Sequence, residues 1–256
     1  NRMDNQDVVE LFGNNIPHEL RLRDAIINDL IVPFHYYGIR DELIDYGLSD
    51  SAERRLIAQI ANEDNCNFIH QQIEKHRPNG QKLKALAFCR NIQHARMMAD
   101  NMSEFYHTAY LTGQNKTGER IRAYNDLQSD NKELEILFAV DILNEGVDIP
   151  GVNMVLFLRP TESSTIFIQQ LGRGLRKAEE KEYVVILDFI GNYNNNFMIP
   201  VALSGDRSYN PDIIRKYVIS GNTTIPGAST VHFDEIAKDK IFSSIDKIKG
   251  MKSIIK

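Results

Sequence analysis

The sequence predicts an α/β fold in which a parallel sheet is flanked by helices, and two observations support this. From residue 83 to about residue 189, short apolar runs alternate with longer helical patterns, which is typical of βαβ units. Runs such as Val184-Val185-Ile186-Leu187 are apolar without interruption, as expected for strands buried on both faces. The chain of 256 residues, 42% of them hydrophobic, is long enough to bury a substantial core.

Five strands are expected at these apolar runs, with helices between them. The strands are predicted at Leu83–Cys89, Thr108–Thr112, Glu135–Val140, Met154–Leu158 and Tyr183–Phe189. Helical periodicity predicts crossover helices at Gln93–Phe105, Gly118–Gln128 and Ser164–Lys177, each long enough to join parallel strands. Residues 81–197 are therefore expected to form one α/β domain.

The two ends of the chain have different patterns. Residues 1–80 are predicted to be a mainly helical N-terminal flank, with helices at about His18–Leu30 and Ala52–His76 and a short strand at Phe34–Tyr37. The turn sequence Pro78-Asn79-Gly80 closes this flank. Residues 198–256 are expected to be a C-terminal extension of scattered turns and a final basic amphipathic helix at about Phe233–Lys249, and the sequence assigns this extension no role.

Composition excludes several classes of protein. No apolar run approaches the roughly 18 residues that a membrane span needs, so no membrane role is expected. Cys66 and Cys89 lie far apart, and no metal-ligand spacing occurs, so we expect a reduced, metal-free, cytoplasmic protein. The net charge of −5 gives no bulk basic footprint, so any contact with nucleic acid must be local. The opening Asn1-Arg2 without Met or leader suggests an excised fragment.

The segment from Phe167 to Arg176 is the most informative in the chain. At about 100° per residue, Gln169, Arg173 and Arg176 share one helix face, and the apolar residues with Gly174 fall on the other. Guanidinium groups are always charged and match phosphate oxygens in a bidentate manner. The alternative reading of two helical arginines is an ordinary pair of surface salt bridges, for example to Glu179.

A second segment, Ala139–Pro150, reads as the end of a strand followed by a turn containing Gly146 and Asp148. Ligands of open α/β sheets bind outside the carboxyl ends of the strands, and a glycine there allows close approach of the backbone. Taken alone, Asp148 is equally well explained as a residue at a turn or helix end.

Together these segments resemble the last two motifs of superfamily 2 helicases, and Leu86–Ala95 resembles the motif that opens their second RecA-like domain. The resemblance covers most of residues 83–193. The stretches Leu158–Ser163 and Leu187–Gly191 are similar to the type III restriction-like branch of DEAD/DEAH-box proteins, some of which are joined to a nuclease domain. DEAD-box RNA helicases have Thr at the position of Val140 and His at that of Gln169, so these departures favour DNA over RNA.

The resemblance implies roles for twelve residues. Arg173 and Arg176 would be catalytic arginines, and Gln169, Gly146, Asp148 and Gly172 would contact ATP. The nucleic-acid strand would be contacted by Arg90, Asn91, Thr112, Gly113, Val140 and Asp141. Taken singly, Arg90, Asn91, Thr112 and Gly113 are also ordinary cap or turn residues.

No phosphate-binding GxxxxGK[ST] loop occurs in the chain. Gly113 and Gly118 have the glycine spacing, but Glu119 stands where the lysine would be. The resemblance therefore implies that ATP, and the ligands of its Mg²⁺, are held mainly by a first RecA-like motor domain upstream, and that this chain alone does not hydrolyse ATP. Two alternatives remain: a helicase-like scaffold that docks a partner, and a dinucleotide or nucleotide-sugar enzyme, which lacks its usual GxGxxG.

Overall fold

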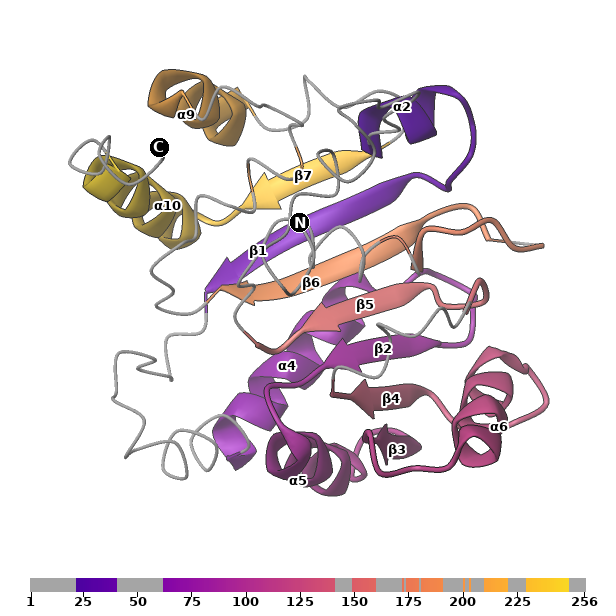
Figure 1. Ribbon diagram of the computed structural model, residues 1–256. Helices are drawn as coiled ribbons and strands as arrows, with labels where there is room; N and C mark the ends of the chain where they lie inside the picture. The colour runs from indigo at the N-terminus through magenta and orange to yellow at the C-terminus, as the bar shows by residue number, and fades with distance from the viewer. Residues whose placement is uncertain are drawn as a thin grey trace, which may run out of the picture.

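The structure is a computed structural model that describes residues 22–40, 62–140, 149–159, 172, 174–179, 181–190, 200, 203, 210–220 and 229–248. Its centre is a seven-stranded sheet with the strand order β3-β4-β2-β5-β6-β1-β7. Every neighbouring pair of strands is parallel, so the arrowheads in Figure 1 all point the same way. The predicted α/β fold with a parallel sheet is therefore confirmed.

The five strands predicted between residues 83 and 189 are all present, with ends within two residues of the predicted ones. They are β2 (Ala85–Phe88), β3 (Thr108–Leu111), β4 (Ile136–Ala139), β5 (Met154–Phe157) and β6 (Val184–Ile190). All residues of β2, β4 and β5 are buried, which is why their sequences are apolar without alternation.

The sheet continues beyond both boundaries drawn from the sequence, at residues 80 and 197. The strand β1 (Phe34–Arg40) comes from the N-terminal flank and pairs with β6, in the register Phe34 to Val184. On its other side β1 pairs with β7 (Thr230–Phe233), which comes from the C-terminal extension. Strands that pair in a sheet can lie far apart in the sequence. The local pattern of these short segments therefore could not predict that they join the sheet.

The helices lie largely where periodicity predicted them. They are α2 (Leu22–Ile27), α4 (Glu63–His76), α5 (Ile92–Met102), α6 (Thr117–Gln128), α9 (Pro211–Ser220) and α10 (Glu235–Ile248). Helix α9 and strand β7 correct the expectation of scattered turns after residue 197. Most of the helix predicted at Ser164–Lys177 lies outside the described residues, but Gly172 and Gly174 there are helical.

The sheet separates two hydrophobic cores, because alternate residues of each strand face opposite sides. Leu86, Phe88, Val155 and Phe157 face a core that includes side chains of α6, α9 and α10. Ala85, Ala87 and Leu156 face the other core, which is built mainly with α4 and α5. Figure 1 shows α5 and α6 near the β3 end of the sheet and α9 and α10 near the β7 end.

Candidate functional site

The carboxyl edge of the sheet brings together five of the six residues predicted to contact nucleic acid. Phe88 pairs with Ala139, and Leu111 also pairs with Ala139, so β2, β3 and β4 end at the same level. Beyond those ends lie Arg90 and Asn91 after β2, Thr112 and Gly113 after β3, and Val140 after β4. The sixth, Asp141, lies outside the described residues.

The turn between β2 and α5 is held by its own side chains. Asn91 is the N-cap of α5, and its Oδ1 accepts a hydrogen bond from the backbone N–H of His94 at 2.9 Å. The backbone N–H of Arg90 donates to Nδ1 of His94 at 3.1 Å. Burial, and then the charge of Arg90, lowers the pKa of His94 to about 4, so its ring is neutral at pH 7. The polar side chain of Asn91 therefore has a structural task, whatever else it contacts.

The turn between β3 and α6 is closed in a similar way. The backbone N–H of Thr112 donates to Oδ1 of Asn115 at 2.8 Å, and the Thr112 hydroxyl accepts from the N–H of Gln114. Oε2 of Glu119 accepts from the N–H of Lys116 at 3.0 Å, and this hydrogen bond lowers the pKa of Glu119. Glu119 thus caps the first turn of α6, which explains why an acid stands at the position where a phosphate loop would need lysine.

Two further arginines at this edge were not predicted as site residues. Arg120 donates from Nη2 to the carbonyl of Gly113 at 2.8 Å and from Nε to that of Asn115 at 3.0 Å, and so stiffens the turn. Arg159 follows β5, whose Phe157 pairs with Phe88, and its charge acts on the thiol of Cys89 beside Arg90. Arg120 belongs to no predicted motif, and Arg159 lies in the stretch Leu158–Ser163, for which no site role was predicted. Only the strand order brings Arg159 beside Arg90.

The predicted catalytic segment is anchored against the sheet. Leu175 is fully buried, and Gly174 is so close to β5 that an added Cβ would lie 2.9 Å from Cγ2 of Val155. A Cβ added at Gly172 would meet no atom within 4 Å, and Arg176 is exposed. The expected division into an inner and an outer side therefore holds for these residues. Gln169, Arg173, Gly146 and Asp148 lie outside the described residues, so their roles stay predictions.

The end of this segment lies at the amino edge of the sheet, opposite the residues predicted to contact nucleic acid. The carbonyl of Leu175 accepts from the N–H of Val32, just before β1 begins, at 2.8 Å. The carbonyls of Gly174 and Arg176 accept from Nζ of Lys181, just before β6 begins, at 2.6 and 2.9 Å. The same Nζ donates to the carbonyl of Pro150 at 2.7 Å.

A pocket of about 210 Å³ opens at this amino edge. Its lining contains Lys82, Lys84 and Lys181, but their ammonium groups are engaged within the protein. Lys82 donates to the carbonyls of Ser129 and Lys132, and Lys84 pairs with Asp130 at 2.8 Å. Lys82 and Lys181 therefore complete the ends of main-chain segments and Lys84 pairs with a carboxylate, so the three lysines in this pocket do not indicate an anion site.

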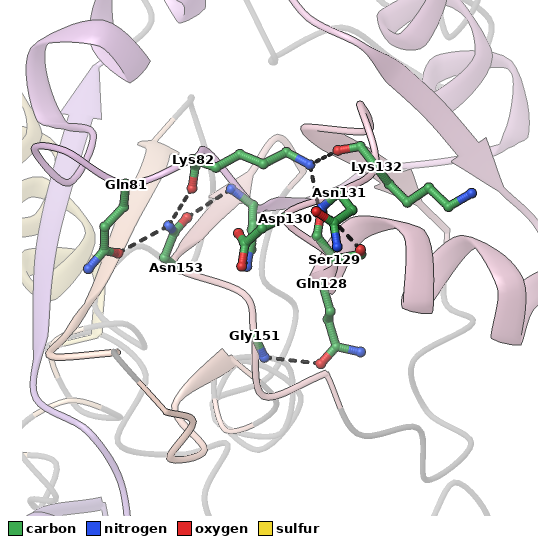
Figure 2. A network of polar contacts seen from close by, with 10 residues as sticks. Gln81, Lys82, Gln128, Ser129, Asp130, Asn131, Lys132, Gly151 and Asn153 are labelled. Atoms are coloured by element: carbon green, nitrogen blue, oxygen red, sulfur yellow. Dashed lines mark hydrogen bonds and ion pairs between the residues drawn. The ribbon is translucent and has the colours of Figure 1, made fainter.

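The side chain of Asn153 hydrogen-bonds to the main chain at this amino edge. Figure 2 shows its amide between Gln81 and Lys82. Its Oδ1 accepts from the N–H of Lys84 at 2.9 Å, and its Nδ2 donates to the carbonyl of Lys82 at 2.8 Å. Gly151 nearby donates its N–H to Oε1 of Gln128 at 3.1 Å. Because Asn153 is 4% exposed, these hydrogen bonds satisfy groups that water cannot reach.

Among the residues that the structure describes, no group of three His, Cys, Asp or Glu side chains could hold a metal ion. No helix in the described part of the chain has the length and apolar character to cross a bilayer. Cys66 and Cys89 are both buried free thiols, and burial raises the pKa of Cys66 to about 11. Burial also raises the pKa of Cys89, so both thiols are protonated at pH 7.

Part of the chain matches a known protein family. Residues 64–178 match the family model described as helicase conserved C-terminal domain. IRC3 of Saccharomyces cerevisiae, named as an ATP-dependent helicase, is 37% identical over 101 residues, which cover 40% of this chain and 14% of the yeast protein. The endonuclease subunit of the type I restriction enzyme EcoKI from Escherichia coli is 23% identical over 224 residues, or 81% of this chain and 19% of that subunit.

Two solved structures share the fold. A fragment described as the HsdR subunit of a type I restriction enzyme from Vibrio vulnificus has a TM-score of 0.62 at 22% identity, over 77% of this chain and 39% of that one. The type ISP restriction-modification enzyme LlaBIII, solved bound to DNA, has a TM-score of 0.57 at 21% identity, over 90% of this chain and 18% of that one. The chain thus spans a minor part of the length of the proteins it resembles. Residues 64–178 include strands β2 to β5 of the parallel sheet. They have the sequence and the α/β fold of a helicase conserved C-terminal domain of superfamily 2.

Proposed function

We propose that this chain is the second motor domain of an ATP-dependent helicase or translocase that acts on DNA. In this proposal Arg173 and Arg176 reach the phosphates of an ATP held by a phosphate-loop domain of the same protein, which also supplies the Mg²⁺ ligands. Gln169, Gly172, Gly146 and Asp148 contact the nucleotide. Closure of the cleft around ATP and its reopening after hydrolysis move the bound strand.

The observation that carries the proposal is the anchoring of Gly174 and Leu175 against the sheet. A glycine packed against Val155 and a fully buried Leu175 fix one side of the segment, while Arg176 is exposed on the other. An arginine finger needs this combination, because charge stabilisation in the transition state depends on a guanidinium that is already in place. An arginine used only in a surface salt bridge does not require such close packing.

A nucleic-acid path along the carboxyl edge is supported by charge and backbone geometry. Helices α5 and α6 both begin at this edge, so their N-terminal N–H groups and positive dipole ends lie there. Arg90 and Arg159 add two guanidinium groups at neighbouring strand ends. These features suit a phosphate backbone although the chain is acidic as a whole.

Two positions and one solved structure support the choice of DNA. Val140 and Gln169 stand where DEAD-box RNA helicases have threonine and histidine. The solved enzyme LlaBIII, which shares the fold, is bound to DNA. A fused nuclease domain, as in restriction enzymes, would be a partner within the same polypeptide.

The decisive experiment measures DNA-stimulated ATP hydrolysis by the complete protein and by its Arg173→Ala and Arg176→Ala variants. Each substitution is expected to lower kcat by about 10³ or more, as for other arginine fingers. Arg96→Ala is the matched control, because Arg96 is an exposed helical arginine in α5 that pairs with Asp100 at 3.8 Å. The isolated chain is expected to show no hydrolysis. Full activity of both arginine variants would instead favour the scaffold interpretation, and a preference for RNA over DNA as stimulator would refute the choice of substrate alone.

A further inference from the structure

We propose that Lys181 is a positioning residue. It holds the end of the arginine-bearing segment, Gly174–Arg176, in place and ties it to Pro150, which follows the predicted ATP-binding residues Gly146 and Asp148. This inference rests on the proposed function, since it assigns a role in ATP hydrolysis to a residue that touches no nucleotide. Its basis is one ammonium group shared between three carbonyls from two distant parts of the chain.

Two of these carbonyls belong to the arginine-bearing segment. Nζ of Lys181 lies 2.6 Å from the carbonyl oxygen of Gly174 and 2.9 Å from that of Arg176. The intervening carbonyl, of Leu175, is taken by the N–H of Val32. Three successive carbonyls after Arg173 are therefore fixed by hydrogen bonds from outside the segment. A helix leaves its last carbonyls without internal donors, so an external cation there both satisfies and orients them.

The third carbonyl links the two predicted ATP motifs. Pro150, whose oxygen lies 2.7 Å from Nζ of Lys181, follows Asp148 by two residues, and the intervening Ile149 is fully buried. An ammonium has three N–H donors, which match three carbonyl oxygens. Lys181 thus ties Gly174 and Arg176 to Pro150. It links the chain beside the predicted catalytic residue Arg173 to the chain just after the predicted ATP-binding residues Gly146 and Asp148.

The chemistry favours positioning over direct binding. A phosphate bound to Lys181 would have to displace carbonyls at 2.6 to 2.9 Å. A misplacement of about 1 Å in a catalytic group can lower a rate by about 100-fold. Loss of the shared ammonium is therefore expected to reduce the rate by releasing the end of the segment, with ATP still able to bind.

The test uses the complete protein and the variant Lys181→Met, which keeps an unbranched apolar stem but removes the ammonium. We expect kcat for DNA-stimulated ATP hydrolysis to fall about tenfold or more, with KM for ATP changed by less than about threefold. The number of bound molecules of a non-hydrolysable ATP analogue per protein should stay at the wild-type value, which shows that the lower rate is not a loss of folded protein.

The matched control is Lys82→Met. Lys82 lines the same pocket and donates to the carbonyls of Ser129 and Lys132 after α6, so it completes a main-chain end in the same way without touching the arginine-bearing segment. It should keep kcat within about twofold of wild type. Equal losses of kcat in the two variants would overturn the positioning role.

A double variant separates this proposal from the proposed function. If Lys181 acts through the arginines, Lys181→Met should slow the Arg176→Ala enzyme by less than about threefold, because groups that act as a unit are not additive. Multiplication of the two losses would mean that Lys181 acts independently and would overturn the proposal. If the Arg173→Ala and Arg176→Ala variants are themselves fully active, the proposed function is refuted, whatever the effect of Lys181→Met.

Discussion

The two edges of the sheet use polar side chains in opposite ways. At the carboxyl edge, Asn91 and Glu119 accept hydrogen bonds from main-chain N–H groups at the starts of α5 and α6. At the amino edge, Lys82 and Lys181 donate to main-chain carbonyls at the ends of segments. Acceptors gather where helices begin, and cations gather where they end.

The geometry of parallel α/β units explains this difference. Each crossover helix begins near the carboxyl edge and returns to the amino edge, so free N–H groups face one edge and free carbonyls the other. The carboxyl edge therefore has a positive backbone potential that attracts phosphates, even in an acidic chain. Three lysines in a pocket thus do not by themselves indicate an anion site, because main-chain carbonyls and a carboxylate are their partners here.

The largest expected effect tests whether the amino edge is structural. Replacing Asn153 by Asp keeps the acceptor for the N–H of Lys84 but puts a buried carboxylate oxygen against the carbonyl of Lys82. We expect the free energy of unfolding at pH 7 to fall by about 2 to 4 kcal/mol, since a buried donor is lost and a carbonyl is left unsatisfied. Urea denaturation measures this loss.

Its pH dependence provides a check. Repulsion and burial should raise the pKa of the introduced carboxyl in the folded state above its unfolded value. A raised folded pKa gives stability that is present at low pH and lost as pH rises. The difference in the free energy of unfolding between wild type and the variant should therefore become smaller towards pH 4. A difference in the free energy of unfolding that grows on acidification would contradict the structural role given to Asn153 at the amino edge.

The second effect tests the close approach of the arginine-bearing segment to the sheet. In Gly174→Ala the new Cβ meets Val155 at 2.9 Å, and a β-branched side chain in a buried strand has little freedom to move. We expect a loss of about 1 to 3 kcal/mol in the free energy of unfolding, as for other overpacked sites. Gly172→Ala, with nothing within 4 Å, should leave stability unchanged or raise it by up to about 1 kcal/mol. Thermal unfolding of both variants should rank them in this order, and the reverse order would show that the segment is not anchored there.

The smallest effect tests whether the carboxyl edge contacts nucleic acid. Arg90→Ala and Arg159→Ala, made in the complete protein, should each weaken DNA binding by about tenfold and reduce the slope of log K against log salt by about one. Lys84→Ala, at the other edge, should change neither quantity. Salt titrations of binding to one duplex check this, and equal effects at the two edges would remove the distinction between them.

Much of the fold could be predicted because its signals are local. Strands β2, β4 and β5 are apolar at every position, and α5 and α6 show helical periodicity and capping residues. Strand β7 was missed because the four residues Thr230–Phe233 carry too short a pattern, and pairing with β1 makes them a strand.

For the site, the sequence by itself determined which residue types could meet phosphates, because Gln169, Arg173 and Arg176 recur at the spacing of one helix face. It also determined that Gly174 would face inward. Only the tertiary structure decided that Arg159 lies at the strand end beside β2, and that Lys181 joins Pro150 to Gly174 and Arg176. The physical reason is that periodicity records which side of an element is buried, whereas strand order and the partner of an ammonium group depend on contacts between residues distant in the chain.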